Sequence, residues 1–365
     1  MSVQGWKNCK LEDIAEYKTG KLNSNAAEVN GAYPFFTCSP ETLNINSHAF
    51  DCEAAILAGN NANGIFCLKY YNGKFNAYQR TYIITTDPSV VDVKFLFYQL
   101  DLQLNRLQSI SHGTATKYLT IPLLNEIEVV LPSIVTQIRI ASILSALDDK
   151  IELNRQINAT LEAIAQAIFK EWFVNFRFPG ATGEMQNSEL GPIPKGWRVG
   201  RLDDVFVLQR GYDLPATNRI VGEYLVIAAS GPSGTHKEFK VKGPGVITGR
   251  SGVLGKTFYV QENYWPLNTS LWIKEFKNST PIYAFYFLQG LDFSNFNAGS
   301  AVPTLNRNHV HNLAVQLPSM EFIIMFDDLI SPFKRQQKLI EDENKLLANT
   351  RDTLLPKLMS GEIEV

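Results

Sequence analysis

Long apolar runs are missing from this 365-residue sequence, and none approaches the roughly 18 residues that a membrane-spanning helix needs. The N-terminal stretch MSVQGWKNCK also lacks the apolar core of a signal peptide. Only four cysteines occur, and because none forms a C-x-x-C pair, their spacing argues against a zinc site. We therefore expect free thiols in a reducing cytoplasm, no membrane partner, no metal and no cofactor. A net charge of −2 gives no overall preference for nucleic acid.

Motifs of three enzyme classes are also missing or incomplete. A DNA adenine methyltransferase needs an N/D-P-P-Y/F motif and a glycine-rich cofactor loop, and the sequence has neither. GRSGVLGKT (249–257) ends like a nucleotide-binding loop, but Arg250 replaces the first required glycine and a strand-like TFYVQENYW follows. Nuclease-like D-x-K and E-x-K triplets occur at 92–94, 148–150, 238–240 and 275–277, as chance would produce them. We expect no catalytic residues.

An internal repeat dominates the sequence, because the motifs of the first half return in the second half in the same order. The matched stretches are GWKNCKLEDIAEYKTG (5–20) with GWRVGRLDDVFVLQRG (196–211), AAILAGNNANGIF (54–66) with GVITGRSGVLGKTF (245–258), FLFYQL (95–100) with YAFYFL (283–288), GTATKYL (113–119) with GSAVPTL (299–305), and LP at 131 with LP at 317. The repeat predicts two similar domains. His309 and His311 could share a strand face as metal ligands, but their counterparts are Leu123 and Asn125, which favours ordinary surface histidines.

Each LP pair leads into a long helical pattern with a heptad spacing of apolar residues. The first seam consists of Ile140, Leu144, Leu147, Ile151, Asn154, Asn158, Leu161, Ala165, Ile168 and Trp172. The second consists of Phe326, Ile330, Phe333, Gln337, Ile340, Asn344, Leu347, Arg351, Leu354 and Leu358. These seams predict an antiparallel coiled coil whose central polar residues fix the register; two independent core helices are the alternative. Pro332 is expected to kink the second helix or to start its regular part.

The predicted fold is therefore α+β, with two similar mixed α/β units separated by two long helices. The boundaries implied by the motifs are 1–133 for the first unit, 134–178 for the central helix, 179–319 for the second unit and 320–365 for the C-terminal helix. Charge differs between these parts, since residues 191–319 contain 13 Lys and Arg against 8 Asp and Glu. Both helical segments are acidic, so the second unit is the part expected to meet phosphates.

Three further stretches carry a resemblance to a known family: ILSALDDKIELNRQINATLEAIAQAIFKEWFVNF (143–176), ELGPIPKGWRVGRLDDV (189–205) and LLPKLMSGEI (354–363). Together with the repeat, they resemble the specificity subunit of a type I restriction–modification system across the whole chain. The resemblance implies that the two units are target-recognition domains, each reading half of a split double-stranded DNA sequence. It also implies helices that set the half-site spacing and bind two methyltransferase subunits, restriction subunits that join through the complex, and no chemistry by this chain.

Candidate DNA contacts follow from the residue types that read base edges and phosphates. In the first unit they fall in the 60–63 turn, the 74–80 segment and 111–118. In the second they fall near residue 210, in 230–237, in 250–256 and in 300–308. The candidates are Lys18, Lys21, Asn60, Asn61, Asn63, Lys74, Gln79, Arg80, His112, Thr114, Thr116, Lys117, Arg210, Tyr212, Arg219, Ser230, Thr235, His236, Lys237, Arg250, Ser251, Lys256, Ser300, Thr304, Arg307 and Asn308. The alternative function is a coiled-coil scaffold whose globular ends bind protein.

Overall fold

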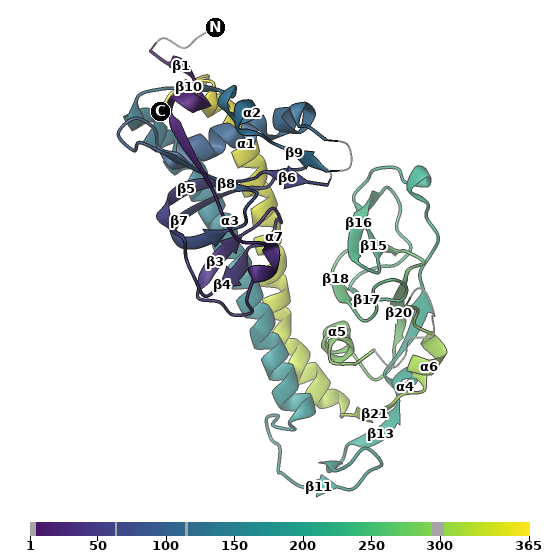
Figure 1. Ribbon diagram of the computed structural model, residues 1–365. Coiled ribbons are helices and arrows are strands. Elements are labelled where there is room, and N and C mark those ends of the chain that lie inside the picture. The colour runs from purple at the N-terminus through teal and green to yellow at the C-terminus, as the bar shows by residue number, and fades with distance from the viewer. Residues whose placement is uncertain (1–4, 63, 114–115, 294–302) are drawn as a thin grey trace. The chain divides into compact units, whose positions relative to one another are not determined.

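The chain divides into two compact units in the computed structural model, which describes residues 5–62, 64–113, 116–293 and 303–365 (Figure 1). Unit 1 comprises Met1–Arg155 with Glu341–Val365, and unit 2 comprises Gln156–Ile340. Each unit therefore holds one copy of the repeat and one half of each long helix. The four-segment division implied by the motifs remains a prediction.

Unit 1 is built on a six-stranded sheet with the order β2-β8-β5-β7-β3-β4. At its centre β5 pairs antiparallel with both β7 and β8, while β3 pairs with β7 in parallel. The two ends of the repeat meet in a separate pair, β1 with β10. The elements are β1 (Lys7–Lys10), η1 (Leu11–Asp13), β2 (Ala15–Thr19), η2 (Ser24–Ala26), β3 (Tyr33–Phe36), β4 (Leu43–Ile45), β5 (Phe50–Ala58), β6 (Asn60–Asn61), β7 (Leu68–Ala77), β8 (Thr81–Thr86), α1 (Val93–Ile110), β9 (Lys117–Tyr118), α2 (Ile121–Asn125) and β10 (Glu128–Leu131).

Side chains alternate along β5 and so contribute to two separate apolar clusters. Ala55 and Leu57 are fully buried in the cluster that includes α1. Ala54 and Ile56 belong to a smaller cluster on the other face of the sheet. α1 begins where the Asp92 carboxylate accepts a hydrogen bond from the Phe95 amide at 2.8 Å, which satisfies one of the free donors of the first turn.

Unit 2 repeats this order of elements, with one interruption. Its sheets have the orders β14-β20-β17-β18 and β16-β15-β19. β18 and β19 together take the position that β7 holds in unit 1. If the two sheets of unit 2 are joined at this position, their strand order matches that of the six-stranded sheet of unit 1. The elements are β11 (Met185–Gln186), β12 (Ile193–Pro194), β13 (Arg198–Arg201), α4 (Leu202–Val205), β14 (Phe206–Arg210), η4 (Ala216–Asn218), β15 (Tyr224–Ala228), β16 (Gly231–His236), β17 (Gly245–Gly249), β18 (Thr257–Val260), β19 (Tyr264–Pro266), β20 (Ser270–Phe276), α5 (Pro281–Gln289), α6 (Arg307–His311) and β21 (Ala314–Leu317).

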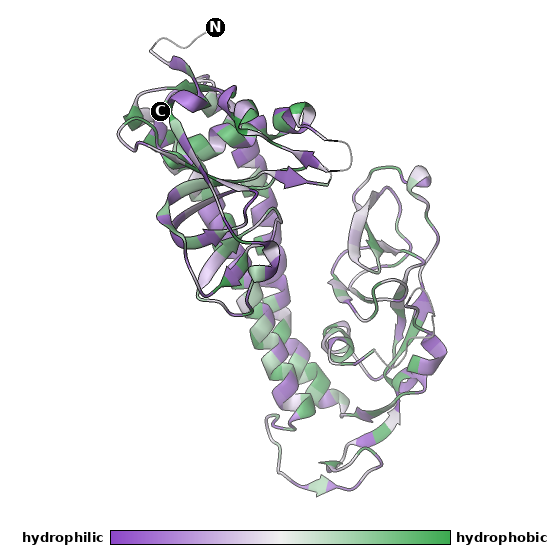
Figure 2. Ribbon diagram, viewed as in Figure 1, coloured by the Kyte–Doolittle hydropathy of each residue, from purple (hydrophilic) through white to green (hydrophobic). Residues whose placement is uncertain are grey.

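The two long helices are α3 (Ile134–Phe169), extended by a π-helical turn η3 (Lys170–Val174), and α7 (Met320–Met359). In each unit, residues later in α3 contact residues earlier in α7, so the two helices run antiparallel. All the predicted seam residues are buried or half-buried, which confirms the heptad assignment. Apolar and polar residues alternate along both helices (Figure 2). α7 begins at Met320 and continues as a helix through the exposed Pro332; a kink there, or a start of the regular part, remains a prediction.

The polar positions of the seams pair in each unit separately. In unit 1, Nδ2 of Asn154 donates to Oδ1 of Asn344 at 2.8 Å, and Asn154 is only 1% exposed. In unit 2, Nε2 of Gln337 donates to the carbonyl of Asn158 at 3.1 Å. Buried polar pairs of this kind favour one register, because a slipped helix would leave them without partners.

Asp327 on α7 is a half-buried carboxyl at the start of α5, and its stability contribution depends on pH. Burial raises its pKa to about 6 from an ordinary 3.8, although hydrogen bonds from Thr280 and the Tyr283 backbone oppose the rise. Because the pKa of Asp327 is higher in the folded state than in the unfolded state, ionising its carboxyl costs free energy of folding. This destabilisation grows as pH rises from 3.8 to about 6 and is complete above that range. We expect Asp327→Asn to increase the free energy of unfolding by about 1–2 kcal/mol at pH 8 and by about half as much at pH 5, after allowance for solvent screening. Urea unfolding at both pH values measures this, and an equal gain at both would contradict the titration.

Candidate nucleic-acid interface

Two short strands of unit 1 lie side by side: β6, from the shared motif at 54–66, and β9, from the shared motif at 113–119. β6 pairs antiparallel with β9, so that Asn60 lies opposite Tyr118 and Asn61 opposite Lys117. The amide of Leu119 donates to the carbonyl of Gly59 at 2.8 Å and continues this pairing. A few backbone hydrogen bonds thus join two segments that are far apart in the sequence. Their polar side chains therefore lie together beside the β6–β9 pair.

The backbone conformation at Gly113, the first residue of the shared motif at 113–119, requires a glycine. Gly113 has φ +99°, and a Cβ atom there would lie 2.0 Å from the carbonyl oxygen of Thr116. This close turn lets His112 and Tyr118 exchange backbone hydrogen bonds at 3.1 and 2.9 Å. As a result His112, Thr116 and Lys117 lie next to the β6 strand. Their partner in the motif, Thr114, lies outside the described residues.

The turn before β8 adds further candidates to this edge. The amide of Gly59 donates to the carbonyl of Arg80 at 2.8 Å, and Nε2 of Gln79 donates to Oδ1 of Asn23 at 2.9 Å. Lys21 is exposed next to Leu22, whose carbonyl accepts from the Gln79 amide. We call the set Lys21, Asn60, Asn61, Gln79, Arg80, His112, Thr116 and Lys117 the unit-1 cluster.

Two candidates of unit 1 lie apart from this cluster. Lys74 on β7 lies opposite Asp51, near the start of β5, whereas the cluster lies beyond the end of that strand. Lys18 lies inside β2, opposite Ile83. Asn63 lies outside the described residues.

The same two shared motifs meet in unit 2. Ser251 forms a bridge with Thr304, and the amide of Leu305 donates to the carbonyl of Arg250 at 2.8 Å. The amide of Arg250 donates to the carbonyl of Thr269 at 2.9 Å, as Gly59 does to Arg80 in unit 1. The backbone of this junction is therefore common to both copies, while its side chains differ.

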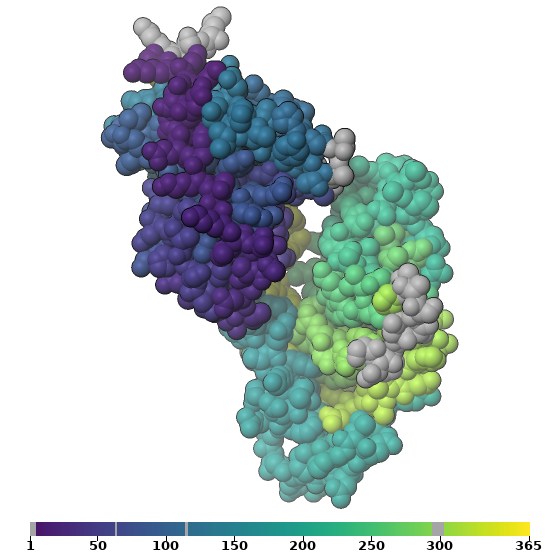
Figure 3. Space-filling model, viewed as in Figure 1, coloured from purple at the N-terminus to yellow at the C-terminus, as the bar shows by residue number. Residues whose placement is uncertain are grey.

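The junction of unit 2 borders a cavity of about 470 Å³ rich in arginine and asparagine. Its polar lining residues are Arg210, Arg250, Thr304, Asn306, Arg307 and Asn308. Arg210, Arg307 and Asn308 are exposed, while Arg250 is half-buried and donates through Nη1 to the carbonyl of Asn268 at 3.3 Å. The segment that follows residue 302, in yellow-green, lies at the surface of unit 2 (Figure 3). Guanidinium groups converging on a concave surface suit phosphates and guanine edges.

The loop 249–257 contributes to this surface and is not a nucleotide-binding loop. Nζ of Lys256 donates to the carbonyl of Ser230 at 3.0 Å and lies 5.4 Å from the centre of the Phe258 ring. The residues after the loop form β18, whereas a phosphate loop requires a helix there. Ser230, Ser251 and Lys256 join the cavity-lining candidates Arg210, Arg250, Thr304, Arg307 and Asn308 as the unit-2 cluster.

The remaining candidates of unit 2 lie elsewhere or serve the core. Arg219 donates through Nη1 to the carbonyl of Ser233 on β16, the strand that also carries Thr235 and that Lys237 directly follows. Tyr212 packs against the rings of Trp265 and Trp272. Ser300 lies outside the described residues.

Two histidine interpretations need correction. His236 was predicted at the DNA surface but is 5% exposed, because its Nδ1 accepts a hydrogen bond from the Ile220 amide and its ring packs on Trp265. His311 was predicted to be an ordinary surface histidine, but it is half-buried at the end of α6, and its Nε2 accepts from the Leu208 amide at 2.9 Å. Burial lowers the pKa of His311, which keeps this acceptor neutral. His309, its neighbour on α6, is exposed, as expected.

Sequence reasoning missed Asn268, whose backbone carbonyl accepts from Nη1 of Arg250 and whose side-chain Nδ2 donates to Oδ1 of Asp213. The repeat contained the necessary signal, since Asn268 corresponds to Gln79, a residue that was selected. In the described part of the chain, none of the helices has the length and apolar character that a bilayer crossing requires. The same residues contain no group of three or more His, Cys, Asp or Glu side chains placed to hold a metal ion.

The fold defines a class of protein in which one α/β unit occurs twice, each copy presents polar side chains at an equivalent place, and the chain also contains two long helices. The chain belongs to the family described as the type I restriction modification DNA specificity domain, whose sequence model matches residues 3–163 and 194–343. The two matched segments correspond to the two copies of the repeat.

Curated relatives carry the names of specificity subunits. The chain is 36% identical over 220 residues to the type I restriction enzyme EcoDI specificity subunit of Escherichia coli, an alignment that covers 55% of this chain and 48% of that relative. It is 28% identical over 316 residues to the MjaIX specificity subunit of Methanocaldococcus jannaschii, covering 78% and 71% of the two chains. The chain thus spans about half the length of the first of these relatives. The crystal structure of a type I restriction-modification S subunit from M. genitalium has a similar fold, with a TM-score of 0.63, 18% identity and coverage of 97% and 96%.

Proposed function

We propose that this chain is the sequence-specific DNA-binding subunit of a type I restriction–modification complex. Each unit reads one half of a bipartite double-stranded target through the cluster at its junction. The supporting observation is that the two clusters share one backbone arrangement and differ in side chains. Asn60 and Asn61 suit adenine edges, whereas Arg210, Arg250 and Arg307 suit guanine edges and phosphates.

The helix pair supports the second part of the proposal. α3 and α7 link the two units through the chain, and we propose that they set the half-site spacing and bind two methyltransferase subunits. Restriction subunits join through that complex, which acts on DNA in the cytoplasm. The chain itself carries out no catalysis and holds no cofactor in this proposal. Its clusters contain arginine, lysine, asparagine and hydroxyl side chains, which bind DNA without changing it.

Mapping methylated bases in cells tests this function. Cells that express the chain together with its methyltransferase partner should carry modified adenines in one bipartite sequence with a gap of fixed length. Cells that express the methyltransferase alone are the control and should lack this pattern. Methylation of a single continuous sequence, or of the same sites without the chain, would contradict the proposal.

A further inference from the structure

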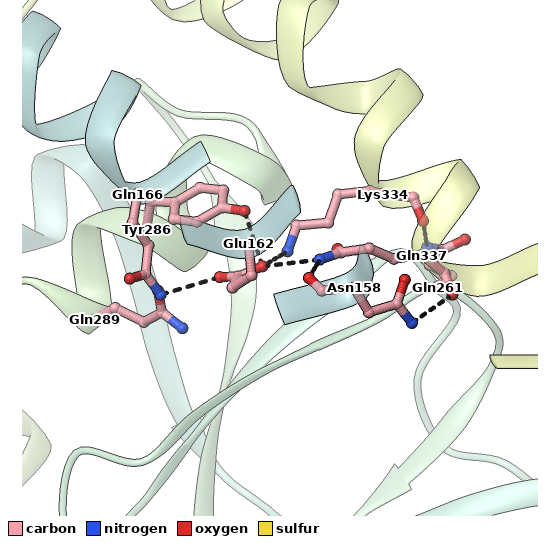
Figure 4. A network of polar contacts seen from close by, with 8 residues as sticks. All are labelled: Asn158, Glu162, Gln166, Gln261, Tyr286, Gln289, Lys334 and Gln337. Carbon is pink, nitrogen blue, oxygen red and sulfur yellow. Dashed lines mark hydrogen bonds and ion pairs between the residues drawn. The ribbon is translucent and has the colours of Figure 1, made fainter. Parts of the chain in front are cut away.

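A lysine in unit 2 occupies a cage of three aromatic rings. The ammonium of Lys334 lies 4.4, 4.9 and 5.8 Å from the ring centres of Phe285, Tyr286 and Tyr259, which we call the unit-2 cage. Its Nζ also donates to Oε2 of Glu162 at 2.7 Å (Figure 4), and the Lys334 side chain is 8% exposed. A buried ammonium is tolerated here because ring faces and a carboxylate replace its water.

A similar cage recurs in unit 1, where Tyr70, Phe97 and Tyr98 form the unit-1 cage. Phe97 and Tyr98 match Phe285 and Tyr286 in the sequence repeat. Tyr70 matches Tyr259 by strand register, because Tyr70 pairs with Ala55 and Tyr259 pairs with Val246, the repeat counterpart of Ala55. The ring pair of Phe97 and Tyr98 lies at 5.0 Å and 73°, and the pair of Phe285 and Tyr286 at 4.9 Å and 73°. The pair of Tyr70 and Phe97 lies at 6.3 Å, against 5.9 Å for its counterpart.

The internal lysine and its carboxylate are absent from the unit-1 cage. The offset of 186 residues between the two LP pairs makes Asp148 the counterpart of Lys334, and Ala348 the counterpart of Glu162. Both positions thus lose the groups that fill the unit-2 cage. A cavity of about 370 Å³, lined by all three rings of the unit-1 cage, lies there instead.

The charges around this cavity favour a cation. Its lining contains three carboxylates, Asp101, Asp148 and Asp149, and two cations, Lys94 and Arg351. Arg351 is engaged by Asp148 at 2.6 Å, and Oδ2 of Asp148 also accepts from the Tyr98 hydroxyl at 2.6 Å. The ammonium of Lys94 lies 5.1 Å from the Tyr70 ring centre and so engages one of the three rings. The lining charge is therefore negative, next to rings whose geometry holds an ammonium in the other unit.

We propose that the unit-1 cage binds a primary alkylammonium group, supplied by a lysine side chain of a partner protein or by a free amine. Phe97 and Tyr98 provide the ring faces, Tyr70 shares its ring with Lys94, and Asp101 and Asp149 provide the negative charge. In unit 2 the chain occupies the equivalent cage with its own lysine, so unit 1 is the copy with room for an external cation. This inference does not depend on the DNA target.

Ligand-observed NMR on the full chain tests the site with three probes: lysine blocked as an amide at both ends, butylamine, and equally blocked norleucine. We expect the two ammonium probes to bind about tenfold or more tightly than norleucine, because norleucine has no charge. Tighter binding of blocked lysine than of butylamine indicates a protein side chain as the natural source, and the reverse indicates a free amine. Binding of norleucine as tight as that of both ammonium probes would overturn the proposal.

Three variants locate the binding. Asp101→Asn with Asp149→Asn should weaken the ammonium probes about tenfold, while the control Glu12→Gln with Glu16→Gln removes the same charge from exposed positions outside the cavity and should not. The triple variant Asp148→Lys, Ala348→Glu and Arg351→Ala transfers the unit-2 arrangement into unit 1 and should abolish binding with the fold retained. Unfolding midpoints verify that fold. Ammonium binding unchanged in the folded triple variant would contradict the site.

Discussion

Replacing Lys334 by methionine should lower the free energy of unfolding by about 3–5 kcal/mol, because it leaves the Glu162 carboxylate half-buried without its cation. Burial tends to raise the pKa of Glu162, but Lys334 beside it holds that pKa below its ordinary value. The tyrosine hydroxyl of Tyr286 and Nε2 of Gln337 also donate to Oε2 of Glu162, at 3.2 and 3.3 Å (Figure 4). The surroundings of Glu162 thus stabilise its charged form. The neutral donors Tyr286 and Gln337 cannot replace the favourable charge interaction with the Lys334 ammonium.

Urea unfolding of the full chain measures this loss, and a double variant separates charge from packing. Lys334→Met combined with Glu162→Leu removes both charges and should recover most of the loss, since apolar groups replace a buried pair at little cost. Lys338→Met is the matched control: Lys338 pairs with Glu262 at 2.6 Å, but the Glu262 side chain is 53% exposed. We expect a loss of less than about 1 kcal/mol there. Equal losses in the Lys334 single and double variants would show that packing alone explains the effect.

Replacing Arg210 and Arg250 together by alanine should lower the affinity for the DNA target roughly 100-fold, and it should do so through one half-site only. Each arginine that reads a base edge contributes about 1–3 kcal/mol, and the two line one cavity of unit 2. The unit-1 cluster is untouched by these substitutions. The variant is therefore expected to keep its discrimination at one half of the target and to lose it at the other. Arg198→Ala is the matched control, because Arg198 is exposed on β13 of the same unit and does not line the cavity.

Much of the fold could be predicted because the sequence states it twice. The repeat gave two similar units, and the heptad seams gave the antiparallel helix pair with its polar centre at Asn154 and Asn158. The pairing between the two shared motifs of each unit could not be predicted in the same way. The hydrogen bond from the Leu305 amide to the Arg250 carbonyl, for example, joins segments far apart in the sequence, and no local sequence pattern indicates that they meet. Pro332 shows a further limit of local rules, since the packed seam keeps α7 helical through a residue that usually ends a helix.

The candidate site was predicted by residue type and corrected by burial. Polar residues of loops were selected as contacts, but nothing in the sequence distinguishes a loop tip from a loop that folds back. His236 and Tyr212 fold back onto Trp265 and serve the core, while Arg210, Arg250 and Arg307 converge on one cavity. The unit-1 cage was equally hidden, because its three rings come from β7 and α1 and its empty position is visible only beside the filled cage of unit 2.

The central claim is that the two units read different halves of one DNA target. Fluorescence anisotropy tests it most directly, with the chain and its methyltransferase partner at one fixed salt concentration and with duplexes in which either half of the mapped target is scrambled. We expect each scrambled half to weaken wild-type binding strongly. The variant Arg210→Ala with Arg250→Ala should respond to the scrambling of one half and become indifferent to the other. Wild-type binding that is insensitive to both scrambled halves, or a variant that loses discrimination equally at both, would contradict the account.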